Sequence, residues 1–313
     1  MNNVSTTQDQ PSAGADSDNE ETQSTIDTAV LMEPYFQRHL GETPLNIAPE
    51  RSAELMSEVF QGRIWDLVAT KGCPPGGIQP FESYPEFRAI SVSYSGLAMV
   101  WCIARYGVFM LDVVRSARGT IEGPTDIGQA WSELKGYLEY ATALRQEDRA
   151  WPNKLERPRL DTGNRVIEET NDMFFGAVGW ILLHEIAHVK SNHESMSHRS
   201  IEDENEADDF AADWVFKDVP TERQREFRIL VVGVALAWLM LFAPVGGDTK
   251  HPPAYVRVMR VASYFEAAKD SVALEAVAHL FKALFFPTMT PPTFETPDEL
   301  FHWTVMKMRE LAS

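Results

Sequence analysis

The most constraining feature of this 313-residue chain is the segment 180–188, which reads WILLHEIAH. It holds two histidines four positions apart, His184 and His188, and Glu185 directly follows the first. Residues four apart lie on one face of an α-helix, so both imidazoles point to one place and can bind one metal ion. Residues 174–183 are apolar almost throughout, which predicts a buried helix. Two histidines in such a helix need polar partners, and a metal ion supplies them.

Glu185 is suited to acid–base chemistry at this predicted metal. On the helix it is rotated away from the two histidines, but it still reaches a water at the ion and can act as its general base. The alternative interpretation is a partly exposed helix that carries two ordinary histidines, because HExxH is a short pattern. The residues that follow make that alternative weak.

A catalytic zinc ion needs three protein ligands and an open position. Residues 200–212 read SIEDENEADDFAA, and Ser200 with Asp203 approximates the capping box that begins a helix. Glu204 comes sixteen positions after His188, which lets the chain reverse and bring this carboxylate to the metal. Asp208 lies one turn further on the same face, where it can accept the remaining N–H of a ligand histidine. The sequence therefore predicts His184, His188 and Glu204 as zinc ligands, supported by Asp208.

The order HEIAH followed by Glu204-x-x-Ala207-Asp208 resembles the gluzincin metallopeptidases, whose signature is HExxH…ExxAD. This resemblance implies a zincin-like fold and peptide hydrolysis. In length and zinc motif the chain is similar to the Lit-like phage-exclusion peptidases, which implies that the substrate is a host protein cleaved during phage infection.

A second similarity lies in residues 248–257, which read DTKHPPAYVR. The prenyl-protease and HtpX families carry a Thr-His-Pro stretch with an arginine six residues after the histidine, although here Lys250 interrupts the pairing. By this resemblance His251 would steady the oxyanion and Arg257 would support the site. The alternative for His251 is an ordinary residue at the start of a helix.

Other carboxylates compete for the third ligand position. Glu194 stands six residues after His188, where metzincin metallopeptidases place their third ligand, but that pattern requires glycine at the position of Ser191. Glu202 and Glu206 flank Glu204, and either would be the ligand instead if the register of the helix were different. His193 and His198 are further candidates, although loop histidines are more often solvated. The sequence favours Glu204.

Hydrophobic periodicity predicts an α+β fold that is mostly helical with a small sheet. Helices are expected at 49–70, at 125–145, after Thr221 and after Thr296, and a strand at 87–94 could be an edge that pairs with substrate. Residues 108–114 are too uniformly apolar to assign. The predicted organisation is a disordered acidic tail at 1–28, an N-terminal helical region at 29–157 and a zinc-binding catalytic region at 158–313. One continuous domain is the alternative.

Charge and cysteine content narrow the partners and the compartment. The 28 basic and 46 acidic residues give a net charge of −18, which disfavours nucleic acid and anionic membranes. Cys73 and Cys102 in dissimilar contexts suit a reducing compartment, and residues 1–28 lack the features of a secretory signal, so we expect a cytoplasmic protein. The uncharged run at 229–243 is shorter than the roughly 20 residues that span a bilayer, which predicts a buried core helix.

Together these features predict a zinc-dependent endopeptidase that acts on a protein or peptide substrate. Glu185 would take a proton from the attacking water and pass it to the leaving amine. Two alternatives belong to other classes. One is a non-catalytic binding protein stabilised by zinc, and the other is a membrane-associated processing peptidase that uses residues 229–243.

Overall fold

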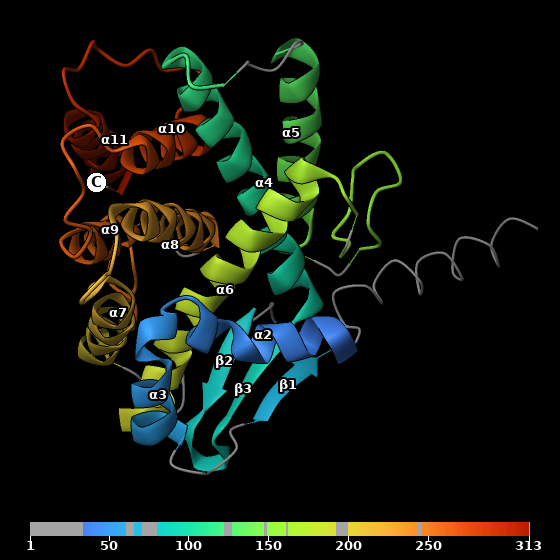
Figure 1. The fold of residues 1–313 in the computed structure, drawn as a ribbon, viewed down its shortest axis with the longest axis vertical. Coiled ribbons are helices and arrows are strands. Elements are labelled where there is room, and N and C mark those ends of the chain that lie inside the picture. Colours follow the sequence, from blue (N-terminus) through green and yellow to red (C-terminus); the bar gives the residue numbers. More distant parts are fainter. Residues whose placement is uncertain are drawn as a thin grey trace, which may run out of the picture.

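The computed structural model describes residues 34–60, 66–70, 80–121, 127–146, 149–160, 162–191, 200–242 and 246–312. Several sequence predictions fall outside these ranges: the acidic tail at 1–28, and the alternative metal ligands Glu194, His193 and His198. The described chain is mostly helical with one small sheet, which confirms the predicted fold class (Figure 1).

The main helices, in chain order, are α2 (Pro34–Asn46), α3 (Ser52–Leu55), α4 (Tyr94–Ala117), α5 (Ile127–Ala143), α6 (Arg165–Ser191), α7 (Ile201–Phe216), α8 (Glu222–Phe242), α9 (Ala254–Ala262), α10 (Val272–Phe285) and α11 (Pro297–Ala312). Short helical turns at Pro49–Arg51 and Met56–Phe60 flank α3. The helices predicted at 125–145, after Thr221 and after Thr296 correspond to α5, α8 and α11.

The sheet has three strands in the order β1 (Asp66–Thr70), β3 (Ala89–Ser93) and β2 (Phe81–Tyr84). β1 runs parallel to β3, and β2 runs antiparallel to it. The strand expected at 87–94 is β3, but β3 is paired on both sides, so the prediction that it is an edge open to substrate is wrong. Within the described sheet, β1 and β2 are the two edge strands, and each pairs with β3.

Two boundaries differ from the prediction for physical reasons. The helix expected over 49–70 is wrong in its last part, because residues 66–70 pair with β3 over long range and this pairing overrides the local periodicity. The strand ends at Ser93 because its hydroxyl accepts a hydrogen bond from the Gly96 amide at 3.0 Å and caps α4. Helix α4 also takes in residues 108–114, which periodicity left unassigned.

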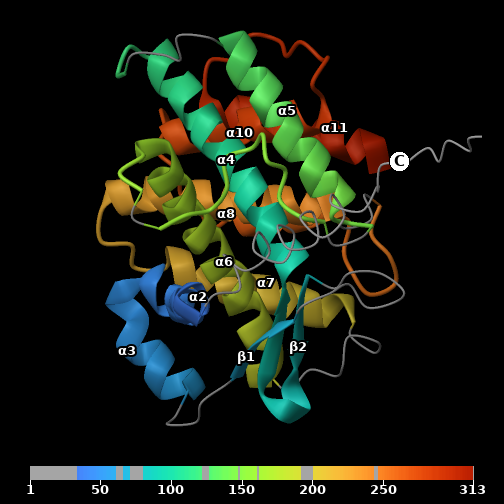
Figure 2. The ribbon, with the colours of Figure 1, turned by 90° about the vertical axis from the view of Figure 1, so that its right-hand side faces the viewer.

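Helix α6 runs through the middle of the molecule (Figure 1). It packs against α2, α4, α7 and α8 and against strands β2 and β3, and Figure 2 shows the same helix from a second direction. One core of buried residues extends over both sides of Pro158 and includes Trp101, Phe174 and Phe281. The segment that carries the predicted metal ligands is therefore built into the main core.

Two apolar helices bear on the membrane alternative. Residues 229–238 of α8 are buried, which confirms the predicted core helix. Among the described residues, α4 is long and apolar enough to cross a membrane by length and composition, and 83% of its apolar window is buried inside the protein.

Close packing of α2 on α6 generates a stability prediction. A Cβ at Gly179 would lie 2.9 Å from the Thr43 carbonyl oxygen, a backbone atom that cannot move aside. We expect Gly179→Ala to lower the free energy of unfolding by about 1–3 kcal/mol. Gly41→Ala is the matched control, because a Cβ at this position in α2 meets nothing within 4 Å and alanine favours a helix. Urea denaturation measures both variants, and equal stability of the two would contradict this packing.

Candidate metal centre

Two helices supply the three predicted ligands. His184 and His188 lie on one face of α6, and Glu204 lies in the first turn of α7. The start of α7 is fixed by the predicted capping box: the Asp203 amide donates to the Ser200 hydroxyl at 3.2 Å, and the Ser200 amide donates to the Asp203 carboxylate at 2.8 Å. This cap sets which carboxylates of the acidic segment face α6.

Small side chains let α7 approach α6 closely. The alanines at positions 207, 211 and 212 are fully buried. Glu204 is also buried, at 3% exposure, whereas Glu202 and Glu206 are exposed. The Glu206 carboxylate instead accepts a hydrogen bond from the Ser191 hydroxyl at 2.7 Å. The register of α7 therefore brings Glu204, and not its two acidic neighbours, to the histidines.

The candidate ligand atoms lie within 4.8 Å of one another, close enough to share one metal ion. The Nε2 atoms of His184 and His188 are 3.2 Å apart. The Glu204 carboxylate oxygens lie 3.4 Å from His184 Nε2 and 3.5 Å from His188 Nε2. Ligands about 2.0–2.2 Å from a tetrahedral zinc ion are about 3.3–3.6 Å from one another. Imidazole nitrogen and carboxylate oxygen are donors that zinc accepts, so these residues fit a metal in both chemistry and spacing.

A second set of contacts reaches the other ring nitrogen of His184, Nδ1. The Asp208 carboxylate lies 3.0 Å from His184 Nδ1. Arg257 of α9 donates from Nε and Nη2 to the two oxygens of Asp208, both at 2.7 Å. Arg257 also lies 3.6 Å from the Glu204 carboxylate. Asp208 is thus placed to fix the ring of His184, and Arg257 to fix Asp208.

Burial and charge compete in setting the protonation of this cluster. Burial by itself would raise the pKa of Glu204, but the contact with His184 and the positive charge of Arg257 outweigh it and keep this pKa below its usual value. Burial also opposes the charge on Asp208, and the Arg257 guanidinium keeps the pKa of that carboxyl low. Both carboxylates are therefore ionised, the form that can bind a cation or orient an imidazole.

Glu185, the predicted base, is buried at 6% exposure. Its Oε2 atom accepts a hydrogen bond from the Ser83 hydroxyl of strand β2 at 2.7 Å. Sequence reasoning missed Ser83, because no motif links positions 102 residues apart. In the structure residues 81–84 alternate between buried and half-buried positions, as in a strand, but such a pattern does not identify the partner of Ser83.

His251 contacts Asp248 and not the ligand cluster. Its Nδ1 atom is 3.1 Å from the Asp248 carboxylate, and its amide donates to the same carboxylate at 2.8 Å. These contacts belong to the turn that leads into α9. The two residues predicted from residues 248–257 therefore differ: Arg257 joins the buried network, and the oxyanion role of His251 stays a prediction.

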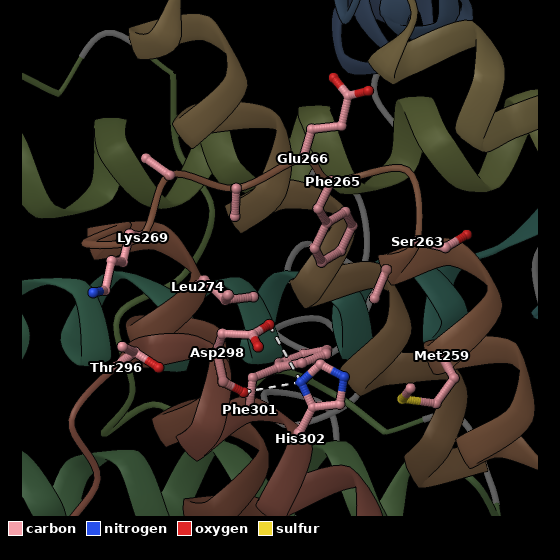
Figure 3. A pocket seen from close by; sticks show the side chains of 13 residues that line it. Met259, Ser263, Phe265, Glu266, Lys269, Leu274, Thr296, Asp298, Phe301 and His302 are labelled. Atoms are coloured by element: carbon pink, nitrogen blue, oxygen red, sulfur yellow. Dashed lines mark hydrogen bonds and ion pairs between the residues drawn. The ribbon is translucent and has the colours of Figure 1, made fainter.

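A pocket of about 600 Å³ lies elsewhere, between α9, α10 and α11 (Figure 3). Phe265 and Phe301 line it, and at its edge His302 Nδ1 lies 3.2 Å from the Asp298 carboxylate. None of the ligand-cluster residues lines this pocket, so it takes no part in the chemistry considered below.

The role of Asp208 can be tested against a matched pair on the same two helices. Asp208→Asn leaves Arg257 without its carboxylate partner and weakens the hold on His184, so we expect zinc affinity to fall by about 10- to 100-fold. Asp209→Asn is the control, because Asp209 forms a partly exposed pair with Arg260 at 2.6 Å and does not touch the cluster. Competition with a chromophoric chelator measures both affinities. Equal loss in the two variants would show that Asp208 acts only through the packing of α7 on α9.

Comparison with known proteins places this geometry in a family. The Peptidase U49 family model matches residues 90–278, more than half of the chain, and this span contains every residue of the His184–His188–Glu204–Asp208–Arg257 network. The chain is also similar to the cell death peptidase of Escherichia coli strain K12, with 23% identity over 262 residues that cover 79% of this chain and 86% of the relative. No solved structure matches. The resemblance to Lit-like peptidases is thus confirmed, and the chain belongs to the Peptidase U49 family.

Proposed function

We propose that this peptidase is a zinc-dependent endopeptidase in which His184, His188 and Glu204 hold the metal and Glu185 is the general base. The proposal is supported by the buried group of two imidazoles and one carboxylate. The two Nε2 atoms are 3.2 Å apart, Glu204 Oε2 lies 3.4 Å from His184 Nε2, and Glu204 Oε1 lies 3.5 Å from His188 Nε2. A predicted base stands on the same helix, directly after the first ligand. Zinc suits this mixed nitrogen and oxygen donor set with three protein ligands.

Zinc bound here would polarise the substrate carbonyl and increase the acidity of water. The protein residues would do the rest. The Glu185 carboxylate accepts a proton from the attacking water and delivers it to the leaving amine. Asp208 keeps the His184 ring in position through Nδ1, and Arg257 balances the charge of Asp208 and Glu204. His251 is left out of this proposal, because Asp248 holds its imidazole.

Strand β2 is the element best placed to bind substrate. It is an edge strand of the described sheet, and the side chain of its Ser83 touches Glu185. A substrate in extended conformation could add to this edge through main-chain hydrogen bonds, which would bring a peptide bond toward the metal centre. The proposed substrate is therefore a protein segment that can become extended.

The proposed chemistry separates metal binding from catalysis. We expect Glu185→Gln to keep one zinc per chain and to lower cleavage by at least about 1,000-fold, because the amide cannot accept the proton. The assay incubates zinc-loaded protein with a proteome-derived peptide library and identifies new termini by mass spectrometry. Glu206→Gln, an exposed change on α7, is the control and should cleave as wild type does. Equal cleavage by wild type and Glu185→Gln would rule out Glu185 as the base.

The relative named cell death peptidase suggests a cellular role. We propose that this enzyme acts in the bacterial cytoplasm and cleaves a host protein during phage infection. We further propose that loss of this host protein stops cell growth. We expect induced expression in Escherichia coli to slow growth or reduce phage yield for wild type, and to do neither for Glu185→Gln at equal protein level. Plating efficiency and growth curves measure this. Indistinguishable wild-type and variant cultures, with and without phage, would contradict the proposed role.

A further inference from the structure

The hydrogen bond from Ser83 to Glu185 is a contact that the proposed function does not need by itself. The hydroxyl donates to Oε2 at 2.7 Å, and both residues are buried, with Ser83 at 2% and Glu185 at 6% exposure. A hydrogen bond to an ionised acceptor is among the stronger ones in proteins. It joins the edge strand of the sheet to the predicted base on α6.

The position of Ser83 is fixed by the strand that carries it. Phe81, two residues earlier and on the same face, is buried and packs edge-on against Trp238 of α8 with 5.3 Å between ring centroids. Antiparallel pairing sets Ser83 opposite Ile90. The amide of Ser93 also donates to the Pro80 carbonyl at 2.9 Å, just before the strand begins. The hydroxyl is therefore presented by a well-anchored backbone.

The helix backbone, by contrast, does not fix the terminal side-chain torsion of Glu185, which sets the orientation of its carboxylate. The backbone of α6 sets the position of its Cα, but the terminal torsion of a glutamate carboxylate is broad and nearly two-fold. A general base must direct one oxygen at the proton that it removes, within hydrogen-bond reach. A fixed donor on one oxygen restricts the rotation of the carboxylate about this torsion.

We propose that Ser83 is a positioning residue that fixes the carboxylate of Glu185 in its reactive orientation. This inference rests on the proposed function of Glu185. Because Ser83 lies on the edge strand that we propose for substrate, the same residue also connects the substrate-binding backbone to the base. Ser83 would thereby fix the position of substrate bound along β2 relative to the proton acceptor on α6.

Three variants test this role. Ser83→Ala removes the hydroxyl, and Ser83→Thr keeps it. Ser91→Ala is the matched control: it removes a buried hydroxyl from the adjacent strand at a position paired with Glu82, on the opposite face from Ser83. Kinetics use a peptide that spans a cleavage site found for wild type in the library assay. Zinc content and a crystal structure of each variant provide readouts that do not depend on activity.

We expect Ser83→Ala to lower kcat by about 10- to 100-fold with KM and zinc content unchanged, as for loss of an interaction that orients a reacting group. Ser83→Thr should keep kcat within about threefold of wild type, and Ser91→Ala should have the wild-type kcat. The crystal structure of Ser83→Ala should show the Glu185 carboxylate rotated. A wild-type kcat in Ser83→Ala, an equal loss in Ser83→Thr or Ser91→Ala, or loss of zinc would overturn the proposal. If wild type cleaves nothing, the proposed function fails, and an unrotated Glu185 in the Ser83→Ala crystal then overturns the positioning role independently.

Discussion

The ion-pair network around Asp208 is the interaction on which the site depends. Burying an unpaired charge is costly, and removal of one member of a buried pair is strongly destabilising. Here each buried charge has a partner: Arg257 donates to both oxygens of Asp208, Asp208 contacts His184, and His184 contacts Glu204. The network therefore requires α6, α7 and α9 to meet at one place, and the small alanines of α7 allow it. A metal ion would complete this arrangement by giving the two imidazoles and the Glu204 carboxylate a common partner.

The site is assembled from segments far apart in the sequence. The sheet contributes Ser83, and α6 contributes His184, Glu185 and His188. Helix α7 contributes Glu204 and Asp208, and α9 contributes Arg257. These elements share one core that extends over both sides of Pro158, with α6 at its centre (Figures 1 and 2). The Peptidase U49 match begins at residue 90, so it includes the candidate metal ligands, Asp208 and Arg257 but starts after strand β2. The Ser83 hydroxyl, which touches the proposed base, thus lies just outside the segment by which the family is recognised.

The sequence predicted best what depends on local spacing. His184 and His188 are four residues apart on one helix, so helical geometry alone places them on the same face. Ser200 and Asp203 form the capping box that begins the next helix, and this too follows from local spacing. The choice of Glu204 over Glu202 and Glu206 also follows, once the register of α7 is set by that cap. Long-range pairing does not follow from local spacing. Periodicity predicts a helix for residues 66–70, which form a strand, and the alternation at 87–94 predicts an edge strand, whereas β3 lies in the middle of the sheet. Ser83 was missed for the same reason, since its partner is 102 residues away.

In the proposed site, His184, His188 and Glu204 together hold one metal ion. Elemental analysis of purified wild type beside Glu204→Gln and Glu206→Gln tests it most directly, because the two variants make the same chemical change two residues apart on α7. We expect one zinc per chain in wild type and in Glu206→Gln, and loss of most of that zinc in Glu204→Gln. A wild type without stoichiometric metal, or equal zinc in all three proteins, would contradict it.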